Sequence, residues 1–252
     1  MTHEGFKLVT PPDGVHALTE RLTADSDVFL VTHMGLAAIE PETWWLDIEG
    51  LVDRPTRLTL ADLASSPTVS VTAIHECAGS PLAPTEPKRR VGNVTWSGVP
   101  LSAVLAHAGV RASASFIWSE GLEWGSFAGM TREAFVKDLP LWKVPDALLA
   151  RHLNGESLSP DRGGPVRLVV PGWAWAECGV AAVEVSVGDD AWRPAELAPR
   201  DGFAWQHFSS SWTPLVPGRY CMACRCVDML GRSQSDAGAR NAVHAIEVEV
   251  AS

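Results

Sequence analysis

Cys77 has the surroundings in this chain that most suggest chemistry. It ends the apolar stretch VSVTAIHEC and is followed by Ala-Gly-Ser-Pro. A thiol at a strand end, beside a glycine that lets another molecule approach the backbone, can serve as a metal ligand. The same thiol can also be a small buried apolar residue. Both interpretations are open from these residues alone.

The other four cysteines do not suggest a metal site. Cys221, Cys224 and Cys226 lie in the segment CMACRC on an expected strand, and Cys178 lies apart from them. Because side chains alternate along a strand, Cys224 and Cys226 face one side and Cys221 the other. No second ligand pair follows at a zinc-like spacing, and an odd number of cysteines argues against a disulfide framework. We therefore expect buried strand cysteines here.

Composition narrows the class of protein. The chain has 252 residues, of which 46% are hydrophobic and 20% charged, as in ordinary globular proteins. A net charge of -10 argues against nucleic-acid binding, which normally requires a basic face. The beginning, MTHEGFKLVTPPDGV, lacks the basic flank and apolar core of a signal peptide, and no apolar run has the length of a membrane span. These features predict a cytoplasmic protein that does not enter a membrane.

The elements that must position Cys77 mix strands with short helices. Strands are expected at TVSVTAIHEC, ASFIWSEGL and GGPVRLVVPG, and a helix over 101–108 that ends at Gly109. Two more helices are predicted, one around 15–22 and one within 145–158 that ends at the turn Asn154-Gly155. After Gly172 the chain changes to short strands separated by turns, which is typical of an immunoglobulin-like β-sandwich. The prediction is an α+β fold with two domains.

Several motifs, in their order along the chain, resemble the sulfite oxidase family. They include THMGLAAIEPETWWLDIEGLVDRP, HECAG, RRVGNVTWSGVPLSAVLAHAGV, LLARHLNGESL and DRGGPVRLVVPG. The later strands resemble the immunoglobulin-like dimerisation domain of that family. The resemblance covers roughly residues 28–250 and implies a mixed α/β molybdopterin-binding domain over 1–172, followed by a shortened immunoglobulin-like domain over 173–252.

The resemblance also implies a cofactor and its ligands. The family transfers an oxygen atom at a molybdenum held by a pyranopterin dithiolene and one cysteine, and Cys77 matches that ligand. His33 matches a histidine of the cofactor-contacting N-terminal loop, and Glu123 an acidic position that contacts the pterin. Arg167 and Arg162 match positions near the cofactor, although Arg162 stands where vertebrate members carry a histidine.

The implied substrate is a small oxyanion such as sulfite. Trp96 matches a tryptophan that lines the substrate pocket, and Arg167 lies near that pocket in relatives. Animal and plant members carry arginines directly after the cysteine loop, where this chain has Ser80-Pro81-Leu82. Arg89 and Arg90, which follow Lys88 in a basic run, are the candidates to replace them. Forked cationic donors suit an oxyanion.

The junction between the two predicted domains departs from the family. The sequence RLVVPG passes directly into WAWAEC, so the segment that grips the cofactor phosphate and the connecting segment after it are missing. This predicts two closely fused domains and a weakened cofactor site. Three functions follow: a sulfite oxidase-type enzyme with an external electron acceptor and a possible homodimer, a shortened non-catalytic relative, and a sulfoxide reductase of the same fold.

Overall fold

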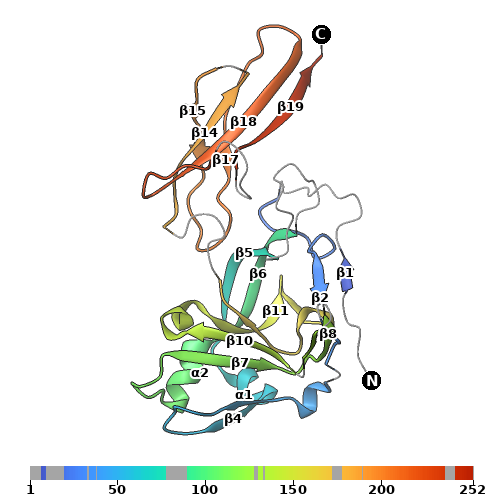
Figure 1. Cartoon of the computed structure of the whole chain (residues 1–252), viewed down its shortest axis with the longest axis vertical. Coiled ribbons are helices and arrows are strands. Elements are labelled where there is room, and N and C mark those ends of the chain that lie inside the picture. The colour runs from blue at the N-terminus through green and yellow to red at the C-terminus, as the bar shows by residue number, and fades with distance from the viewer. Residues whose placement is uncertain are drawn as a thin grey trace.

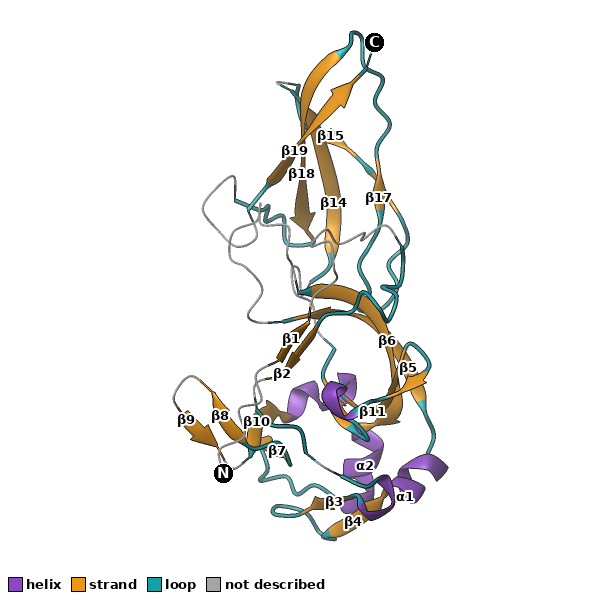
Figure 2. Cartoon of the chain, turned by 90° about the vertical axis from the view of Figure 1, so that its right-hand side faces the viewer, coloured by secondary structure: helices purple, strands orange, loops and turns teal. Residues whose placement is uncertain are grey.

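The fold is described from a computed structural model of the chain. The structure describes residues 7–9, 20–32, 34–37, 39–77, 90–127, 130–132, 134–171, 178–188, 190–235 and 242–251. Figure 1 shows a larger body that holds the N-terminal two thirds of the chain, with a second, strand-rich region at the other end of the long axis. Strands outnumber helices in both parts (Figure 2).

The first region is built on a five-stranded antiparallel sheet. Its strand order is β12-β11-β6-β5, and a further strand, β13, also pairs with β11. The strands are β5 (Val69–Glu76), β6 (Val91–Pro100), β11 (Leu148–Leu153), β12 (Glu156–Ser157) and β13 (Arg167–Val169). At Gly98 the strand β6 passes so close to β11 that a Cβ atom there would clash with the carbonyl oxygen of Leu149. Glycine is therefore required at this position.

Two short helices pack at the end of this sheet that lies away from the second region (Figure 2). Helix α1 (Leu60–Ser65) begins with a capping box, in which Thr59 and Asp62 bond each other's backbone N–H. Helix α2 (Leu101–Ala108) ends at Gly109, whose left-handed φ of 72° favours glycine. The buried residues of both helices join one hydrophobic core with β6 and β11. The sequence predicted α2 and its end correctly.

Short ribbons and 3-10 turns complete the first region. The paired strands are β1 (Lys7–Val9) with β2 (Leu30–Thr32), β3 (Trp45–Ile48) with β4 (Thr56–Thr59), β7 (Phe116–Gly121) with β10 (Phe135–Pro140), and β8 (Gly125–Phe127) with β9 (Met130–Arg132). The 3-10 turns are η1 (Pro41–Thr43), η2 (Leu141–Asp146) and η3 (Pro160–Arg162).

The prediction of a helix within 145–158 is wrong, because this segment forms η2's end, β11 and β12. Leu148, Leu149 and Leu153 of β11 are buried, and the strand pairs with β6 on one side and β13 on the other. A strand covered on both faces carries a continuous apolar run and lacks the alternation that identifies a strand in sequence. The helix predicted around 15–22 lies mostly outside the described residues, and Glu20, Arg21 and Leu22 form bends.

The second region contains a four-stranded antiparallel sheet in the order β15-β14-β18-β19. These strands are β14 (Val180–Val187), β15 (Arg193–Pro194), β18 (Gly218–Asp228) and β19 (His244–Val250), and a small ribbon pairs β16 (Glu196–Leu197) with β17 (Phe208–Ser209). The predicted short strands are present, whereas their assignment to an immunoglobulin-like domain stays a prediction.

The two regions touch along β5. The backbone N–H of Ile74 donates to the carbonyl of Phe203 at 3.1 Å, and that of Trp205 donates to Oδ1 of the fully buried Asn93 at 3.4 Å. Strand β13 belongs to the first sheet, so the junction strand stays with the first region. The predicted boundary after residue 172 falls at residues outside the described set.

No helix in the described ranges is both long and apolar enough to cross a membrane.

Candidate functional site

Cys77 directly follows the last residue of β5, is partly buried and forms no disulfide. Its backbone N–H donates to the carbonyl oxygen of Arg90 at 2.9 Å, which ties the two ends of the intervening loop together. Because side chains alternate along an extended chain, Cys77 faces the same side of the sheet as His75. The loop itself, including Arg89, lies outside the described residues, as does His33.

An aromatic group covers the face of the sheet that leads to Cys77. The imidazole of His75 stacks on Phe29, with ring centroids 4.7 Å apart and an angle of 5° between the planes. The same imidazole meets Trp96 edge to face at 5.5 Å. Trp96 lies on β6 and is almost completely buried. These contacts fix three rings from three different segments against one another.

The guanidinium of Arg167 lies next to this group. Its central carbon is 5.4 Å from the centroid of the Trp96 ring, within cation–π range. Its Nη1 donates to the carbonyl oxygen of Arg162 at 3.2 Å. Burial lowers the pKa of Arg167, the charge of Glu123 raises it in part, and the charge of Arg162 lowers it further. A bound anion would stabilise the charged form of this guanidinium, which burial disfavours.

Arg162 has a different set of partners. Its guanidinium donates to the main-chain carbonyls of Asp25, Val28 and Phe29, at 3.4, 3.2 and 3.5 Å. These bonds hold the segment that carries Phe29 against η3. Its charge still contributes to the site, because the pKa of His75 is lowered to about 3 by burial, by Arg167 and by Arg162, in that order. Arg162 also borders a small pocket with Asp25, Glu156 and Ser159.

The structure brings together most of the residues that the sequence singled out. Trp96, Arg167, Arg162 and Glu123 interact as a group. Arg90 is partly buried and meets Cys77 through its backbone. The sequence interpretation missed two members, His75 and Phe29. A signal was present for His75, since a histidine two residues before Cys77 on an expected strand must share its face.

The Arg167 guanidinium suits an anion, and the Cys77 thiol suits a soft metal. No cluster of three or more His, Cys, Asp or Glu side chains that could hold a metal ion occurs among the residues with described positions. Sulfur ligands suit soft transition metals.

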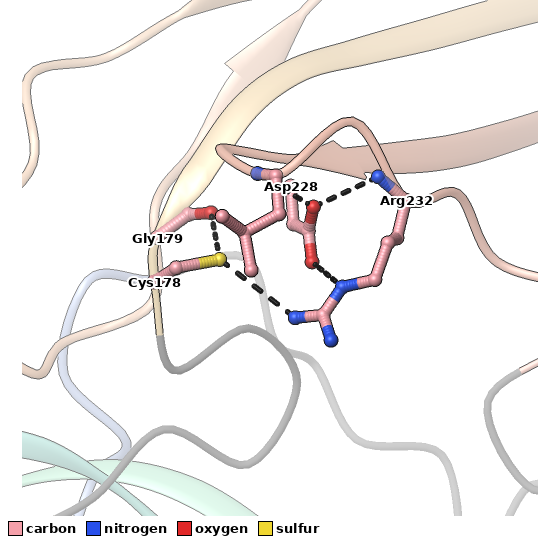
Figure 3. Close-up of polar contacts among 5 residues, drawn as sticks. Cys178, Gly179, Asp228 and Arg232 are labelled. Carbon is pink, nitrogen blue, oxygen red and sulfur yellow. Dashed lines mark hydrogen bonds and ion pairs between the residues drawn. The ribbon is translucent and has the colours of Figure 1, made fainter.

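The second region contains a polar turn in which an arginine is paired with a carboxylate (Figure 3). The Asp228 carboxylate accepts hydrogen bonds from the N–H groups of Leu230 and Arg232, and from Nε of Arg232 at 2.7 Å. Nη2 of Arg232 lies 3.9 Å from Sγ of Cys178. The backbone N–H of Arg232, together with its guanidinium, holds the pKa of Asp228 below its ordinary value.

The cysteines of the second region form no disulfide, and the prediction that its strand cysteines are buried is wrong for Cys221. Cys221 is exposed, whereas Cys224 and Cys226 are partly buried on β18. Burial raises the pKa of both of these thiols, which makes them weak nucleophiles.

Comparison with known proteins links the chain to molybdopterin enzymes. The family profile described as "Oxidoreductase molybdopterin binding domain" matches residues 33–189. The mitochondrial sulfite oxidase of Drosophila melanogaster is 31% identical over 177 residues, which cover 64% of this chain and 30% of that protein. The sulfite oxidase of Gallus gallus is 31% identical over 170 residues, covering 62% of this chain and 37% of that protein. The nitrate reductase [NADH] 1 of Arabidopsis thaliana is 31% identical over 146 residues, covering 52% and 16%.

A solved structure shares the fold. The sulfane dehydrogenase SoxCD from Paracoccus pantotrophus superposes with a TM-score of 0.74 at 22% identity, over 94% of this chain and 83% of that chain. At this identity the likeness concerns the fold alone. The matched part of this chain spans about a third of the length of the curated sulfite oxidases.

Proposed function

Because this chain belongs to the oxidoreductase molybdopterin-binding domain family, we propose that it is a molybdenum-cofactor-dependent oxidoreductase of sulfite oxidase type. The proposed substrate is sulfite or a related small oxyanion, and the electrons pass to an external acceptor. The observation that carries the proposal is the guanidinium of Arg167, whose pKa is lowered by burial, on the sheet that ends in Cys77.

The residues present fit a molybdenum–molybdopterin cofactor. Cys77 offers one thiol, not in a disulfide, directly after a strand. This donor set suits a metal whose remaining ligands belong to the cofactor. The charge of Glu123 acts on Arg167 and raises its pKa in part, and we place Glu123 among the residues that contact the pterin.

When bound, the cofactor supplies a metal that exchanges an oxygen atom with a two-electron change. The protein's own residues do the rest. Cys77 holds the metal through its thiolate, and Arg167 attracts and orients the oxyanion by charge-assisted hydrogen bonds. Phe29, His75 and Trp96 keep water from one side of the site, which strengthens these interactions. Arg162 holds the Phe29 segment in place.

The remaining roles inferred from the family resemblance belong to the same proposal. His33 contacts the cofactor, and Arg89 and Arg90 assist in binding the anion. The second region mediates a homodimer, and the location is cytoplasmic. Because the phosphate-gripping segment is missing by sequence, we expect weaker cofactor binding, since each charge-assisted hydrogen bond is worth about 1.5 to 3 kcal/mol.

Elemental analysis tests the proposal. The full chain, produced in a host that makes the cofactor, should contain about one molybdenum atom per protein, because one thiolate site is proposed. Cys77→Ser should lose the metal, while Cys226→Ser, a partly buried strand cysteine of the second region, should keep it. Wild-type protein should also reduce ferricyanide in a sulfite-dependent manner.

Protein without molybdenum from such a host would refute the enzyme and favour the shortened, non-catalytic relative. Molybdenum without sulfite oxidation, but with reduction of a sulfoxide, would favour the reductase.

A further inference from the structure

Five residues of the site form a closed ring of contacts. His75 stacks on Phe29 and meets Trp96 edge to face. Trp96 lies under the guanidinium of Arg167, which donates to the carbonyl of Arg162. Arg162 completes the ring by donating to the carbonyl of Phe29. Each member is therefore held by the two beside it.

His75 is the member of this ring that lies on β5, the strand that leads into Cys77. The two residues are separated by Glu76 and share one face of the strand. Any displacement of the His75 ring acts on both Phe29 and Trp96, because it fills the space between them. His75 therefore lies on the strand that leads into Cys77 and at the same time contacts Phe29 and Trp96, its two neighbours in the ring of contacts.

We propose that His75 is a positioning residue that holds Trp96 beneath the guanidinium of Arg167 and thereby fixes where a bound oxyanion lies relative to Cys77. The physical basis is preorganisation. An arginine side chain has many rotamers, and restricting it before binding reduces the entropy lost when the anion binds. The role depends on a flat ring that stacks, so another aromatic residue can replace it. This inference rests on the proposed function for the identity of the anion.

Sulfate binding to the purified full chain tests the proposal, because sulfate is an oxyanion that the proposed reaction does not consume. Titration calorimetry on wild type and Arg167→Met first shows that Arg167 binds the anion. His75→Leu should weaken sulfate binding about tenfold, the effect of releasing one ordered side chain. His75→Phe keeps the stack and should bind sulfate within about twofold of wild type. His152→Leu is the matched control, since His152 lies on β11 of the same sheet, opposite Ser97 and thus on the other face from Trp96, and it should leave the affinity unchanged.

The proposal would be overturned by a sulfate affinity in His75→Leu equal to that of wild type, or by equal losses of affinity in His75→Leu and His75→Phe. Unchanged binding by Arg167→Met would do the same. If His75→Leu does not fold, Phe29→Leu removes the other half of the stack and should show the same loss.

The melting temperature separates positioning from a purely structural role. Both His→Leu variants should lower it, but only His75→Leu should change sulfate affinity. Molybdenum content is measured on the same samples. Wild type without molybdenum would refute the proposed enzyme, while the sulfate comparison would still decide the role of His75.

Discussion

The two regions of the molecule place an arginine side chain in opposite environments. In the first region, burial lowers the pKa of Arg167, and its guanidinium lies over an aromatic ring and donates to a main-chain carbonyl. In the second region, Arg232 is largely exposed, and its hydrogen bond to Asp228 raises its pKa. The first arginine is stabilised further by an added anion, whereas the second already has one. The difference separates the candidate anion site from a structural turn.

The largest difference between the regions should appear in the packing of their tryptophans. Trp96→Ala should lower the free energy of unfolding by about 3 to 5 kcal/mol, because it leaves a cavity in a closely packed core. Trp212→Ala should have a smaller effect, since Trp212 is partly exposed and meets Tyr220 at 4.6 Å near the surface. Urea unfolding followed by circular dichroism measures both. Equal losses would mean that the two regions are equally well packed.

The contrast between the two arginines predicts the next effect. Arg167→Met should lower kcat/KM for sulfite by about 10- to 100-fold, the value of one charge-assisted hydrogen bond to the substrate. Arg232→Met should leave kcat/KM unchanged. Steady-state kinetics with ferricyanide as acceptor, normalised to molybdenum content, makes the comparison. A similar loss in both variants would remove the functional distinction between the regions.

Acid should weaken the turn of the second region through Asp228. The folded pKa of this carboxyl lies below its ordinary value of 3.8 because backbone N–H groups and Arg232 favour the charged form. The resulting stabilisation is complete above the unfolded pKa and is lost as the pH falls through the folded pKa. Asp228→Asn should therefore be less stable than wild type at pH 7, and the difference should shrink below about pH 4. Urea unfolding at a series of pH values from roughly 2.5 to 7 gives both curves. Parallel curves would contradict this role of Asp228.

The smallest effect is expected from an exposed ion pair of the first region. Nε of Arg57 donates to Asp47 at 2.6 Å, and its Nη2 donates to the same carboxylate at 2.7 Å. Both side chains remain solvated, so Arg57→Gln should change the free energy of unfolding by less than about 1 kcal/mol. Thermal unfolding at low and high salt provides the measurement. A larger loss of unfolding free energy would show that an ion pair of the first region stabilises the fold even when its side chains are exposed to solvent.

Sequence motifs, together with residues that end helices or form turns, made much of the first region predictable. Gly109 ends α2 where the sequence indicated, and β5, β7 and β13 lie where apolar runs were bounded by turn residues. β11 was mistaken for a helix because both of its faces are buried, with Leu149 in one core and Leu148 in the other, by segments that are distant in sequence. Local patterns do not contain that information.

Some residues of the candidate site could be predicted from the sequence, and others could not. Arg167 and Trp96 were identified by resemblance, and the structure brings them together. The bonds from Arg162 to the carbonyls of 25–29 depend on a fold that joins segments more than 130 residues apart. The sequence did not indicate Phe29, because the role of an apolar ring depends on the residue on which it stacks, and that contact forms only in the fold. His75 could have been found from its spacing to Cys77 alone.

The contact between Phe203 and β5 has a consequence for the chain as a folding unit. β5 is the outer strand of its sheet, and an uncovered outer strand can pair with other polypeptides and aggregate. The segment from the second region occupies part of that edge through the bond between Ile74 and Phe203. The second region thus covers part of the outer edge of the strand that leads into Cys77, and a chain truncated before Phe203 should aggregate more readily than the full chain because that edge is uncovered.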